Sequence, residues 1–354
     1  MREIKINLEN RLSTVYAGGS IDDLAGYADP SKNIIVTDTN VHRLYADRFK
    51  GIPAIVIGTG EGIKTLATVE EIIREFISLG ADRNTFITGI GGGIVSDITG
   101  FAASIFMRGL DFGFVSTTLL AQVDASVGGK NGVNIDRLKN MAGVFCQPRF
   151  VICDHSMLAT LEEEEYRNGM AELVKTACLE NSGLFDFVWQ HREPLRERDA
   201  SAVEEAVYRC AQFKASVVTM DERETGLRRI LNLGHTAGHA LEKVHGVAHG
   251  HAVAAGIGFS LFMSQKFGLI DNAQSERILS MLKFFGLPSG LYDTAAAADS
   301  ARLAEAAASD KKRDGSSVKF VLLEGTGRPV VRDISLSDLD GLIREHITTG
   351  ENYL

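Results

Sequence analysis

The sequence predicts an α/β plus α fold, in which a Rossmann-like α/β domain precedes a mainly α-helical domain. The chain has 354 residues, more than one typical compact core accommodates. Residues 1–158 alternate short β-branched runs with helical patterns, which is typical of a parallel sheet covered by helices. Residues 159–354 instead repeat apolar side chains at helical spacing. We therefore expect two domains, 1–158 and 159–354.

In the first domain, five runs are rich in valine, isoleucine, phenylalanine and threonine, as strands are. The expected strands are 33–38, 54–58, 85–91, 112–118 and 149–154. Between two of them, the run at 68–80 places apolar residues at helical spacing and ends in Gly80, a typical C-cap residue. We expect this run to be one of the helices that cover the sheet.

The second domain contains five long segments with helical periodicity. They are 158–179, 201–221, 233–244, 251–268 and 275–286. The alanine-rich stretch 295–308 is also predicted to be helical, because alanine has the highest helix propensity. The segment VKFVLLEGTGRPVVRD predicts a short β-hairpin at 318–333.

Charge and cysteine usage exclude several classes of protein. The net charge of −9 and the pI of about 5.5 argue against a general binder of nucleic acid or anionic membranes, which needs a broad basic surface. The four cysteines form no CxxC pair, and the N-terminus is charged rather than apolar. No apolar run approaches the roughly 20 residues that span a bilayer. We expect a reduced, cytoplasmic protein.

A glycine cluster at 89–101, GIGGGIVSDITGF, follows an expected strand and precedes an expected helix. Such a turn lets the backbone approach a pyrophosphate, which the helix N-terminus stabilises. The cluster departs from GxGxxG because Ile94 replaces the third glycine, so a tight turn without a ligand is an equally good interpretation. The segment 59–64 and the pair Thr117 and Thr118 would contact the same nucleotide.

Histidine is concentrated in one segment: five of the nine histidines lie between 235 and 251. His235 and His239 are four residues apart and share one face of a helix. Clustered imidazoles commonly bind a divalent metal, and a carboxylate usually completes a catalytic zinc site. Glu172, in the helical GMAELVK, is the expected carboxylate. The alternative is a helix that carries surface histidines without a metal.

Several cations stand beside glycines or polar residues and would suit phosphate or carboxylate groups. These cations are Arg108, Lys130, Lys139, Lys175, Lys214, Arg228, Lys311 and Lys312. Any one lysine is most often a solvated surface charge. Arg228 and Asn232 stand one helical turn apart, so in a helix they could face a single anionic ligand.

Six segments, in this order, closely resemble the signature segments of the 3-dehydroquinate synthase family, a branch of the sugar phosphate cyclases. They are GGGIVSDITGFAASIFMRG, STTLLAQVDASVGGKNGVN, LKNMAGVFCQP, GMAELVK, NLGHTAGHA and HGHAVAAG, and the similarity extends from about residue 59 to 315. The resemblance implies an N-terminal NAD-binding α/β domain and a C-terminal helical domain that binds metal and substrate.

The resemblance also implies ligands, residue by residue. A metal, zinc or cobalt, would be held by Glu172, His235 and His249, where His249 occupies the histidine of the family's HGE segment. NAD would be contacted by Thr59, Gly60, Glu61, Lys64, Gly93, Ile94, Val95, Ser96, Asp97, Thr117, Thr118, Lys130, Lys139 and Thr160. Substrate would be held by Asp124, Lys130, Asn140, Lys175, Lys214, Arg228, Asn232, His239 and a lysine of the pair Lys311 and Lys312. Arg108 resembles the arginine that reaches the neighbouring subunit's phosphate site, which implies a homodimer.

The implied activity is the conversion of 3-deoxy-D-arabino-heptulosonate 7-phosphate to 3-dehydroquinate and phosphate. It combines transient oxidation by NAD, β-elimination, reduction and an intramolecular aldol closure, and belongs to the shikimate pathway towards chorismate and the aromatic amino acids. The alternatives are a sister cyclase such as 2-deoxy-scyllo-inosose synthase, a metal-dependent polyol dehydrogenase, or an inert nucleotide-binding protein. Lys214, Arg228 and Asn232 suit a carboxylate and so favour the acid substrate.

The sequence departs from the family pattern at a few positions. His251 replaces the usual glutamate after HG, and the stretch from His235 to His249 is shorter than in many members. Residues that are commonly glycine, proline, threonine and tyrosine are replaced here by Ser96, Ser116, Asn131 and Cys146. None of these changes removes a metal ligand or a cation.

Overall fold

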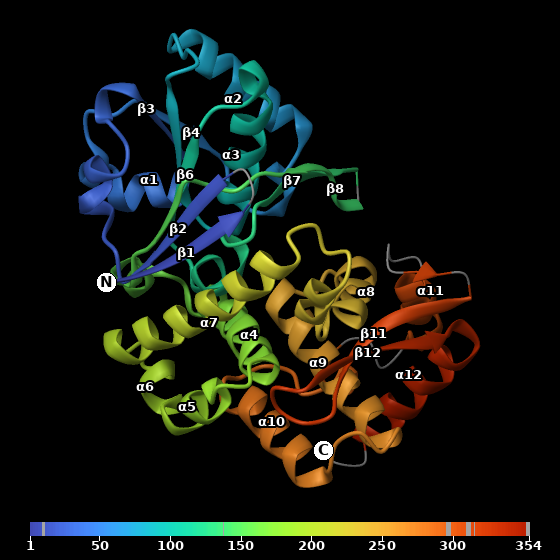
Figure 1. Cartoon of the computed structure of the whole chain (residues 1–354). Coiled ribbons are helices and arrows are strands. Elements are labelled where there is room, and N and C mark those ends of the chain that lie inside the picture. Colours follow the sequence, from blue (N-terminus) through green and yellow to red (C-terminus); the bar gives the residue numbers. More distant parts are fainter. Residues whose placement is uncertain (9–10, 137, 295–298, 309–312, 315, 352–354) are drawn as a thin grey trace. The chain divides into compact units, whose positions relative to one another are not determined.

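A computed structural model describes residues 1–8, 11–136, 138–294, 299–308, 313–314 and 316–351 (Figure 1). The chain forms two compact units. The first unit comprises Met1–Glu162 and Ala200–Arg223, and the second comprises Glu163–Asp199 and Glu224–Leu354. Within the described residues, no helix is both long and apolar enough to cross a membrane.

The first unit is built on a seven-stranded sheet in the order β1-β2-β9-β6-β5-β3-β4 (Figure 1). Its strands are β1 (Arg2–Leu8), β2 (Arg11–Ala17), β3 (Asn33–Asp38), β4 (Ala54–Ile57), β5 (Phe86–Gly91), β6 (Phe112–Ser116) and β9 (Phe150–Cys153). All neighbours pair in parallel except β1 and β2, which form an antiparallel hairpin. The five predicted parallel strands are therefore confirmed, whereas the hairpin was not predicted.

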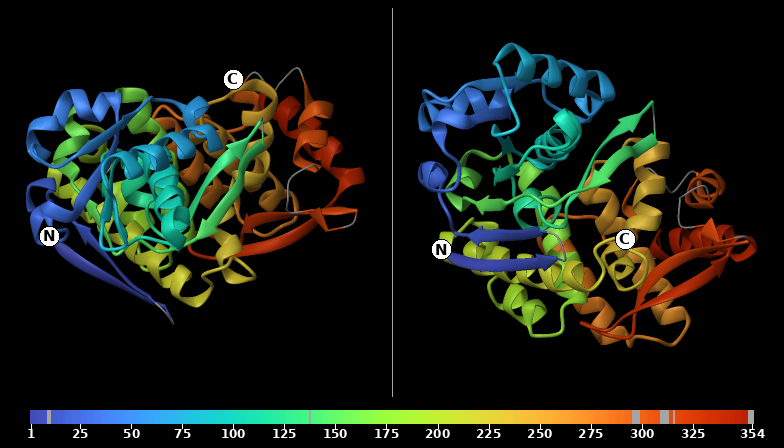
Figure 2. Two further views of the ribbon diagram at one scale, coloured as in Figure 1. Left: turned by 90° about the horizontal axis from the view of Figure 1, so that it is seen from above. Right: turned by 45° about the horizontal axis from the view of Figure 1, so that its top comes forward.

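A second, two-stranded antiparallel ribbon belongs to the same unit. It pairs β7 (Lys130–Ile135) with β8 (Leu138–Phe145). In Figures 1 and 2 this green ribbon extends away from the seven-stranded sheet. This ribbon was not predicted, because most side chains of β8 are exposed and show no apolar alternation.

Among the described residues, four α-helices and several short 3₁₀- or π-helical segments belong to the first unit. The α-helices are α1 (Thr39–Tyr45), α2 (Leu66–Ser78), α3 (Gly93–Ile105) and α7 (Ala200–Met220). The short segments are η1 (Ile21–Gly26), η2 (Pro30–Lys32), η3 (Ala46–Phe49), η4 (Glu61–Ile63), η5 (Phe106–Arg108), η6 (Ala121–Ala125) and η7 (His155–Thr160). The predicted helix at 68–80 is α2, which Thr65 caps by accepting from Thr68 N at 3.2 Å, and Gly80 follows it at φ 72°.

Helix α7 packs with the first unit, although the sequence predicted that all residues after 158 form the helical domain. It buries Val203, Val207 and Cys210 and packs against β1 and β2. An ion pair at 2.7 Å joins Arg2 of β1 to Glu205 of α7. The local helical pattern does not reveal which domain a helix joins, because that depends on the surface that covers its apolar face.

The second unit is mainly helical. It contains α4 (Glu163–Leu179), α5 (Leu184–Gln190), α6 (Arg192–Arg196), η8 (Leu227–Asn232), α8 (His235–His245), α9 (His249–Lys266), α10 (Asn272–Phe284), η9 (Leu291–Asp293), α11 (Ser300–Ala308) and α12 (Leu336–Glu351). The sheet β10 (Arg313–Asp314), β11 (Ser317–Leu323) and β12 (Pro329–Ser335) accompanies them. The pairing Leu323↔Pro329 closes β11 and β12 into the predicted hairpin, which is confirmed.

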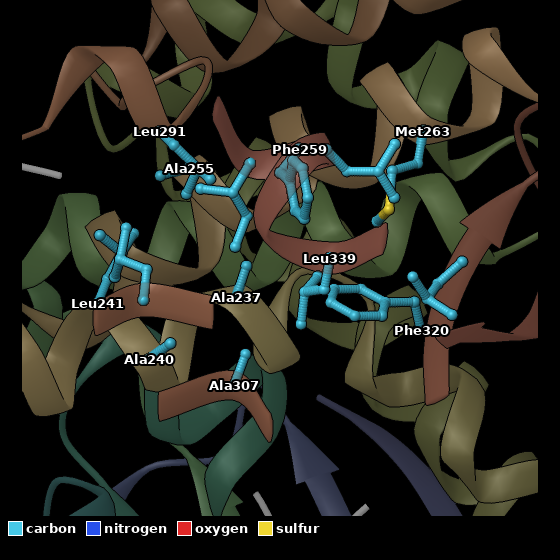
Figure 3. Packing of buried hydrophobic residues seen from close by; sticks show 14 of the residues in the cluster. Ala237, Ala240, Leu241, Ala255, Phe259, Met263, Leu291, Ala307, Phe320 and Leu339 are labelled. Carbon is cyan, nitrogen blue, oxygen red and sulfur yellow. The ribbon is translucent and has the colours of Figure 1, made fainter. Parts of the chain in front are cut away.

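The core of the second unit surrounds α9, whose residues from Ala252 to Leu261 are buried on every face of the helix. Phe259 of α9 and Phe320 of β11 meet edge to face with ring centroids 5.9 Å apart (Figure 3). Two glycines let α9 approach its neighbours closely. A Cβ at Gly256 would lie 2.0 Å from Gly234 O, and a Cβ at Gly250 would lie 2.4 Å from the Cα of Asn168 in α4. The start of α9 is thereby brought against α4.

Candidate active site

Three side chains from three helices of the second unit converge on one point. Glu172 lies in the middle of α4, while His235 and His249 are the first residues of α8 and α9. One ligand atom from each side chain lies within 4.8 Å of the others. Oε1 of Glu172 is 3.5 Å from His235 Nε2 and 3.2 Å from His249 Nε2. The packing of α9 on α4 at Gly250 accounts for this approach.

Each imidazole is held through its other ring nitrogen. Nδ1 of His235 lies 3.1 Å from the carbonyl oxygen of Leu233, and Nδ1 of His249 lies 2.5 Å from Oε1 of Glu242. A hydrogen on each Nδ1 can donate to these acceptors, so each Nε2, which faces Glu172, is the ring nitrogen left for a metal. This tautomer is the one that a metal binds through Nε2.

The ionisation states of the group follow from its burial. Burial lowers the pKa of His235 well below its usual value, so this imidazole is neutral at pH 7. Burial alone would raise the pKa of Glu172, but the Lys175 ammonium and the two imidazoles hold that pKa well below its usual value. Burial also opposes the charged form of His249, yet hydrogen bonds to Glu172 and Glu242 raise its pKa. Glu172 is therefore ionised at pH 7.

These three residues fit a divalent metal. Two imidazole nitrogens and one carboxylate oxygen are the donor set of catalytic zinc sites, which keep a further position open for water or substrate. Glu172 is buried, with a side chain only 1% exposed, and Lys175 contacts its Oε2 without ordinary hydrogen-bond geometry. A carboxylate is rarely buried so deeply unless cations surround it, and a metal would be one more such cation.

Two further histidines of the same segment lie near the group but outside it. His239, one turn after His235 on α8, places its ring 5.4 Å from the His235 ring and nearly perpendicular to it. His251 points to the first turns of α4, where its Nδ1 lies 3.3 Å from Glu164 Oε1 and 3.5 Å from Asn168 Oδ1. The shared helix face thus brings His239 near the group, and the structure gives His251 acidic and amide neighbours instead.

In the first unit, the glycine cluster forms the predicted strand–turn–helix. Strand β5 ends at Gly91, and α3 begins at Gly93. A Cβ at Gly92 would lie 2.9 Å from Thr118 Cγ2, and one at Gly93 would lie 3.0 Å from the Ala125 Cβ. The glycines therefore leave the backbone N–H groups of the first turn of α3 close to the end of β6. This arrangement fits a pyrophosphate.

Part of the predicted segment 93–97 faces the interior. Val95 and Ser96 are buried, and Ser96 bonds the carbonyl oxygen of Gly92 through both its N–H and its hydroxyl. Two departures from the family pattern, Ser96 and Ser116, share one partner: Ser126 Oγ lies 2.7 Å from Ser116 Oγ and 3.3 Å from Ser96 Oγ. These serines shape the turn from inside.

Three predicted residues meet in one polar network beside this turn. Nζ of Lys64 donates to Asp97 Oδ2 at 2.5 Å and to Asn140 Oδ1 at 2.7 Å. Burial holds the pKa of Asp97 above its usual value, although the Lys64 ammonium beside it acts in the opposite direction. Asn134 extends the network: it donates to Glu61 Oε1 at 2.7 Å and accepts from Asn140 N at 2.8 Å.

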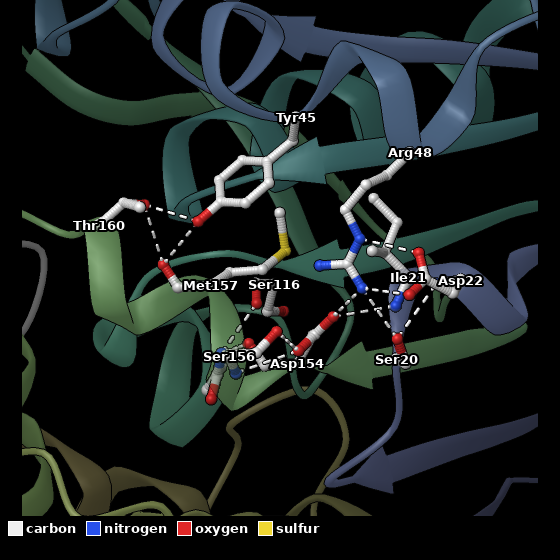
Figure 4. Close-up of polar contacts among 11 residues, drawn as sticks. Ser20, Ile21, Asp22, Tyr45, Arg48, Ser116, Asp154, Ser156, Met157 and Thr160 are labelled. Atoms are coloured by element: carbon white, nitrogen blue, oxygen red, sulfur yellow. Dashed lines mark hydrogen bonds and ion pairs between the residues drawn. The ribbon is translucent and has the colours of Figure 1, made fainter.

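Thr160 ends the turn η7 and is tied to α1. Its hydroxyl lies 2.6 Å from the Tyr45 hydroxyl, and both lie 3.3 Å from the Met157 carbonyl oxygen (Figure 4). Asp154, buried at the start of η7, accepts from Ile21 N at 3.0 Å and from Ser156 N at 3.1 Å. The position of Thr160 therefore depends on side chains from several parts of the first unit.

The predicted cations have different environments. In the first unit, Lys214 is buried and bonds Asp124, donating to its carbonyl oxygen at 2.6 Å and lying 3.0 Å from its Oδ1. In the second unit, Lys175 and Arg228 are buried. Lys130, Lys139 and Arg108 are exposed, as are Thr59 and Gly60. Lys311 and Lys312 lie outside the described residues.

The segment with Arg228 and Asn232 is a 3₁₀-helix rather than an α-helix. With about three residues per turn, residues four apart lie on different faces. The amide of Asn232 donates to Glu224 Oε1 at 2.5 Å. The hypothesis that Arg228 and Asn232 face one anion therefore loses its helical argument and depends on the family resemblance.

Four polar residues at these sites were not predicted from the sequence. They are Asp38, which ends β3 at the carboxyl edge of the sheet and caps α1, and Asn134, Glu224 and Glu242. Only Asp38 had a usable signal, since an acidic residue after a predicted parallel strand lies at the edge where ligands bind. The others are recognised by their contacts alone.

Comparison with known proteins decides the family. Residues 54–168 match the family model described as 3-dehydroquinate synthase N-terminal, and residues 169–313 match the model described as 3-dehydroquinate synthase C-terminal. The chain belongs to the 3-dehydroquinate synthase family. The 3-dehydroquinate synthase of Halorhodospira halophila is 40% identical over 341 residues, which cover 94% of this chain and 95% of that protein. That of Nitrosospira multiformis is 39% identical over 332 residues, covering 90% and 89%.

A solved structure is similar along nearly the whole chain. It is 2-deoxy-scyllo-inosose synthase complexed with carbaglucose-6-phosphate, NAD+ and Co2+, with a TM-score of 0.86, 26% identity, and coverage of 98% of this chain and 100% of that chain. Members of the 3-dehydroquinate synthase family are phosphate-eliminating cyclases, a class of carbon–oxygen lyase, and use NAD and a metal. The chain is an enzyme of this class, which decides against the polyol dehydrogenase and the inert protein.

Proposed function

We propose that this enzyme converts 3-deoxy-D-arabino-heptulosonate 7-phosphate to 3-dehydroquinate and phosphate, with Glu172, His235 and His249 as its metal ligands. The convergence of these three ligand atoms within 4.8 Å carries the proposal. When bound, the metal supplies a Lewis acid that polarises an oxygen of the substrate. NAD, when bound, supplies the acceptor and later the donor of one hydride, so none is consumed.

The residues of each unit have separate tasks in this proposal. In the first unit, the turn at Gly93 and the pair Thr117 and Thr118 bind the nucleotide, together with Glu61, Lys64, Asp97, Lys139 and Thr160. Lys214 and Asp124 hold each other through two contacts and so present a positioned ammonium to the substrate. A preorganised cation stabilises departing phosphate without having to reorganise during the reaction.

In the second unit, Lys175, Arg228, Asn232 and His239 are the proposed substrate residues. Arg228 is only 2% exposed. A buried guanidinium suits a carboxylate ligand, because the two groups can form two parallel hydrogen bonds. His239, whose ring lies beside that of His235, is the residue we propose to move a proton at its ring nitrogen. The acid group distinguishes this substrate from the sugar phosphates of sister cyclases.

One assay tests the reaction. The purified enzyme is given the heptulosonate phosphate with catalytic NAD, and phosphate release is followed with and without a chelator. We expect many turnovers per NAD, loss of activity with the chelator and recovery with Zn²⁺ or Co²⁺. Glucose 6-phosphate serves as the control substrate: faster phosphate release from it would favour the sister cyclase, and chelator-resistant turnover would contradict the metal ligands.

We also propose a homodimer in which Arg108 reaches the neighbouring subunit's phosphate site. Arg108 is exposed and follows α3 in a strained turn, with φ of 49°, 72° and 119° at Met107, Arg108 and Gly109. Such strain at non-glycine residues costs free energy and often marks functional positions. The four free cysteines fit a reducing compartment, and we propose the cytoplasm.

Subunit mixing tests the role of Arg108. Arg108→Ala and His235→Ala should each be inactive alone. If Arg108 acts across the interface, mixed dimers contain one complete site, and a random mixture recovers about a quarter of the normal activity. A monomer by light scattering, or no recovery in mixed dimers, would contradict the proposal.

A further inference from the structure

We propose that Glu242 is a positioning residue of the metal site, whose carboxylate holds His249 in the orientation and tautomer that bind the metal. This inference deepens the proposed function and rests on it. Oε1 of Glu242 lies 2.5 Å from His249 Nδ1, while Nε2 of the same ring lies 3.2 Å from Glu172 Oε1. The imidazole is thus held between two carboxylates, one on each ring nitrogen.

The chain path explains how Glu242 reaches His249. Glu242 lies in the last turn of α8, and its carbonyl oxygen accepts from Gly246 N at 3.0 Å. Gly246, at φ 65° and ψ 24°, ends the helix in the left-handed region and turns the chain back. Only Val247 and Ala248 separate this turn from His249, the first residue of α9. The side chain of the last turn therefore lies beside the first residue of the next helix.

Glu242 holds the ligand without being one. A metal on Nε2 of His249 lies on the far side of the ring from Nδ1, where Glu242 is bonded. Accordingly, among the described residues the ligand atoms that converge come from Glu172, His235 and His249, without Glu242. A carboxylate on Nδ1 fixes the tautomer, makes Nε2 more basic and limits rotation of the ring.

His249 needs this support more than His235 does. The side chain of His249 is 34% exposed, compared with 12% for His235, so fewer neighbours restrain its ring. His235 is oriented by a main-chain acceptor, the carbonyl oxygen of Leu233, which no substitution removes. Glu242, only 5% exposed, supplies the equivalent acceptor for His249 from a side chain. The orientation of His249 therefore depends on the Glu242 carboxylate, which a substitution can remove.

The test measures metal binding directly. Zn²⁺ affinity is determined by competition with a chromophoric chelator, and Co²⁺ absorption reports the ligand geometry. We expect Glu242→Ala to bind Zn²⁺ about 10- to 100-fold more weakly, with an altered Co²⁺ spectrum. Glu242→Gln keeps an oxygen that accepts from Nδ1, so it should recover much of the affinity and the normal spectrum. The NAD dissociation constant should be unchanged in both.

Controls separate the possible failures. Glu193→Gln, which alters an exposed glutamate paired with Arg196 in the same unit, should leave metal affinity unchanged. His235→Ala and His249→Ala must themselves weaken metal binding; if they do not, the proposed metal site fails. If they do, and folded Glu242→Ala binds Zn²⁺ within twofold of normal with an unchanged Co²⁺ spectrum, only the positioning role is overturned. If Glu242→Ala does not fold, Glu242→Lys replaces it as the test variant. An unchanged Zn²⁺ affinity, Co²⁺ spectrum and kcat in Glu242→Lys would then overturn the positioning role.

Discussion

Lys64 donates to the Asp97 carboxylate at 2.5 Å, and its ammonium is largely shielded from solvent, because the side chain is only 7% exposed. The same Nζ donates to Asn140 Oδ1 at 2.7 Å. Residues that the resemblance assigns to the nucleotide and to the substrate are therefore linked through one ammonium. Loss of that ammonium would affect both.

Replacing Lys64 should destabilise the fold as well as the site. Lys64→Met leaves the Asp97 carboxylate, whose side chain is 21% exposed, without its ammonium. Removing one partner of a fully buried pair costs about 3–5 kcal/mol in the free energy of unfolding, and we expect a loss below that range here. The double variant with Asp97→Asn should recover a substantial part of this loss. Denaturant unfolding of the four proteins measures the coupling. A Lys64→Met loss below about 1 kcal/mol would show that the pair is not effectively buried.

Asn134 offers a pair of variants that separate its two hydrogen bonds. Asn134→Asp keeps the acceptor for Asn140 N but loses the donor to Glu61, whereas Asn134→Ala loses both. One hydrogen bond contributes about 1 kcal/mol, or roughly fivefold in a binding constant. We expect both variants to weaken NAD binding, and only Asn134→Ala to raise the substrate KM. Calorimetry for NAD and initial rates for the substrate test this; equal KM values in both variants would contradict it.

Arg228→Gln should chiefly weaken recognition of the substrate carboxylate. A hydrogen bond to a charged group contributes about 1.5–3 kcal/mol, so the substrate KM should rise at least about tenfold. Zn²⁺ and NAD affinities should not change, because Arg228 is in neither ligand set. Steady-state kinetics at saturating NAD and metal provide the measurement. An unchanged KM would count against this role of Arg228.

His346 should make stability depend on pH. Its ring packs against Phe259, Phe262 and Tyr292, and its Nε2 accepts from Leu291 N at 3.2 Å. Burial lowers the pKa of His346 from 6.5 to about 4. Between these values the unfolded chain binds a proton that the folded chain does not. The stability present above pH 6.5 is therefore lost as pH falls, by up to about 3 kcal/mol near pH 4.

Comparison with a non-titrating side chain isolates this effect. His346→Gln retains an oxygen that can accept from Leu291 N but takes up no proton in this range. We expect the difference in unfolding free energy between the original protein and the variant to shrink as pH falls from 6.5 to 4. A difference independent of pH would show that His346 is not buried in its neutral form.

Features that depend on residues close together in the sequence could be predicted, whereas contacts between residues far apart in the sequence could not. The five parallel strands and the turn from Gly91 to Gly93 were predictable, because β-branched runs and glycines act on neighbouring residues. The hairpin of β11 and β12 was predictable for the same reason. The domain of α7 was not, since a helical pattern shows which face is apolar but not what covers it.

The candidate site shows the same division. By itself, the sequence determined that histidines cluster, that His235 and His239 share a helix face, and that the segment could bind a metal. Only the tertiary structure joined Glu172 to residues 63 and 77 positions further along the chain, because Gly250 lets the start of α9 pack closely on α4. It alone placed Glu242 on His249. Local periodicity determines which way a side chain points, and packing between helices decides what it meets.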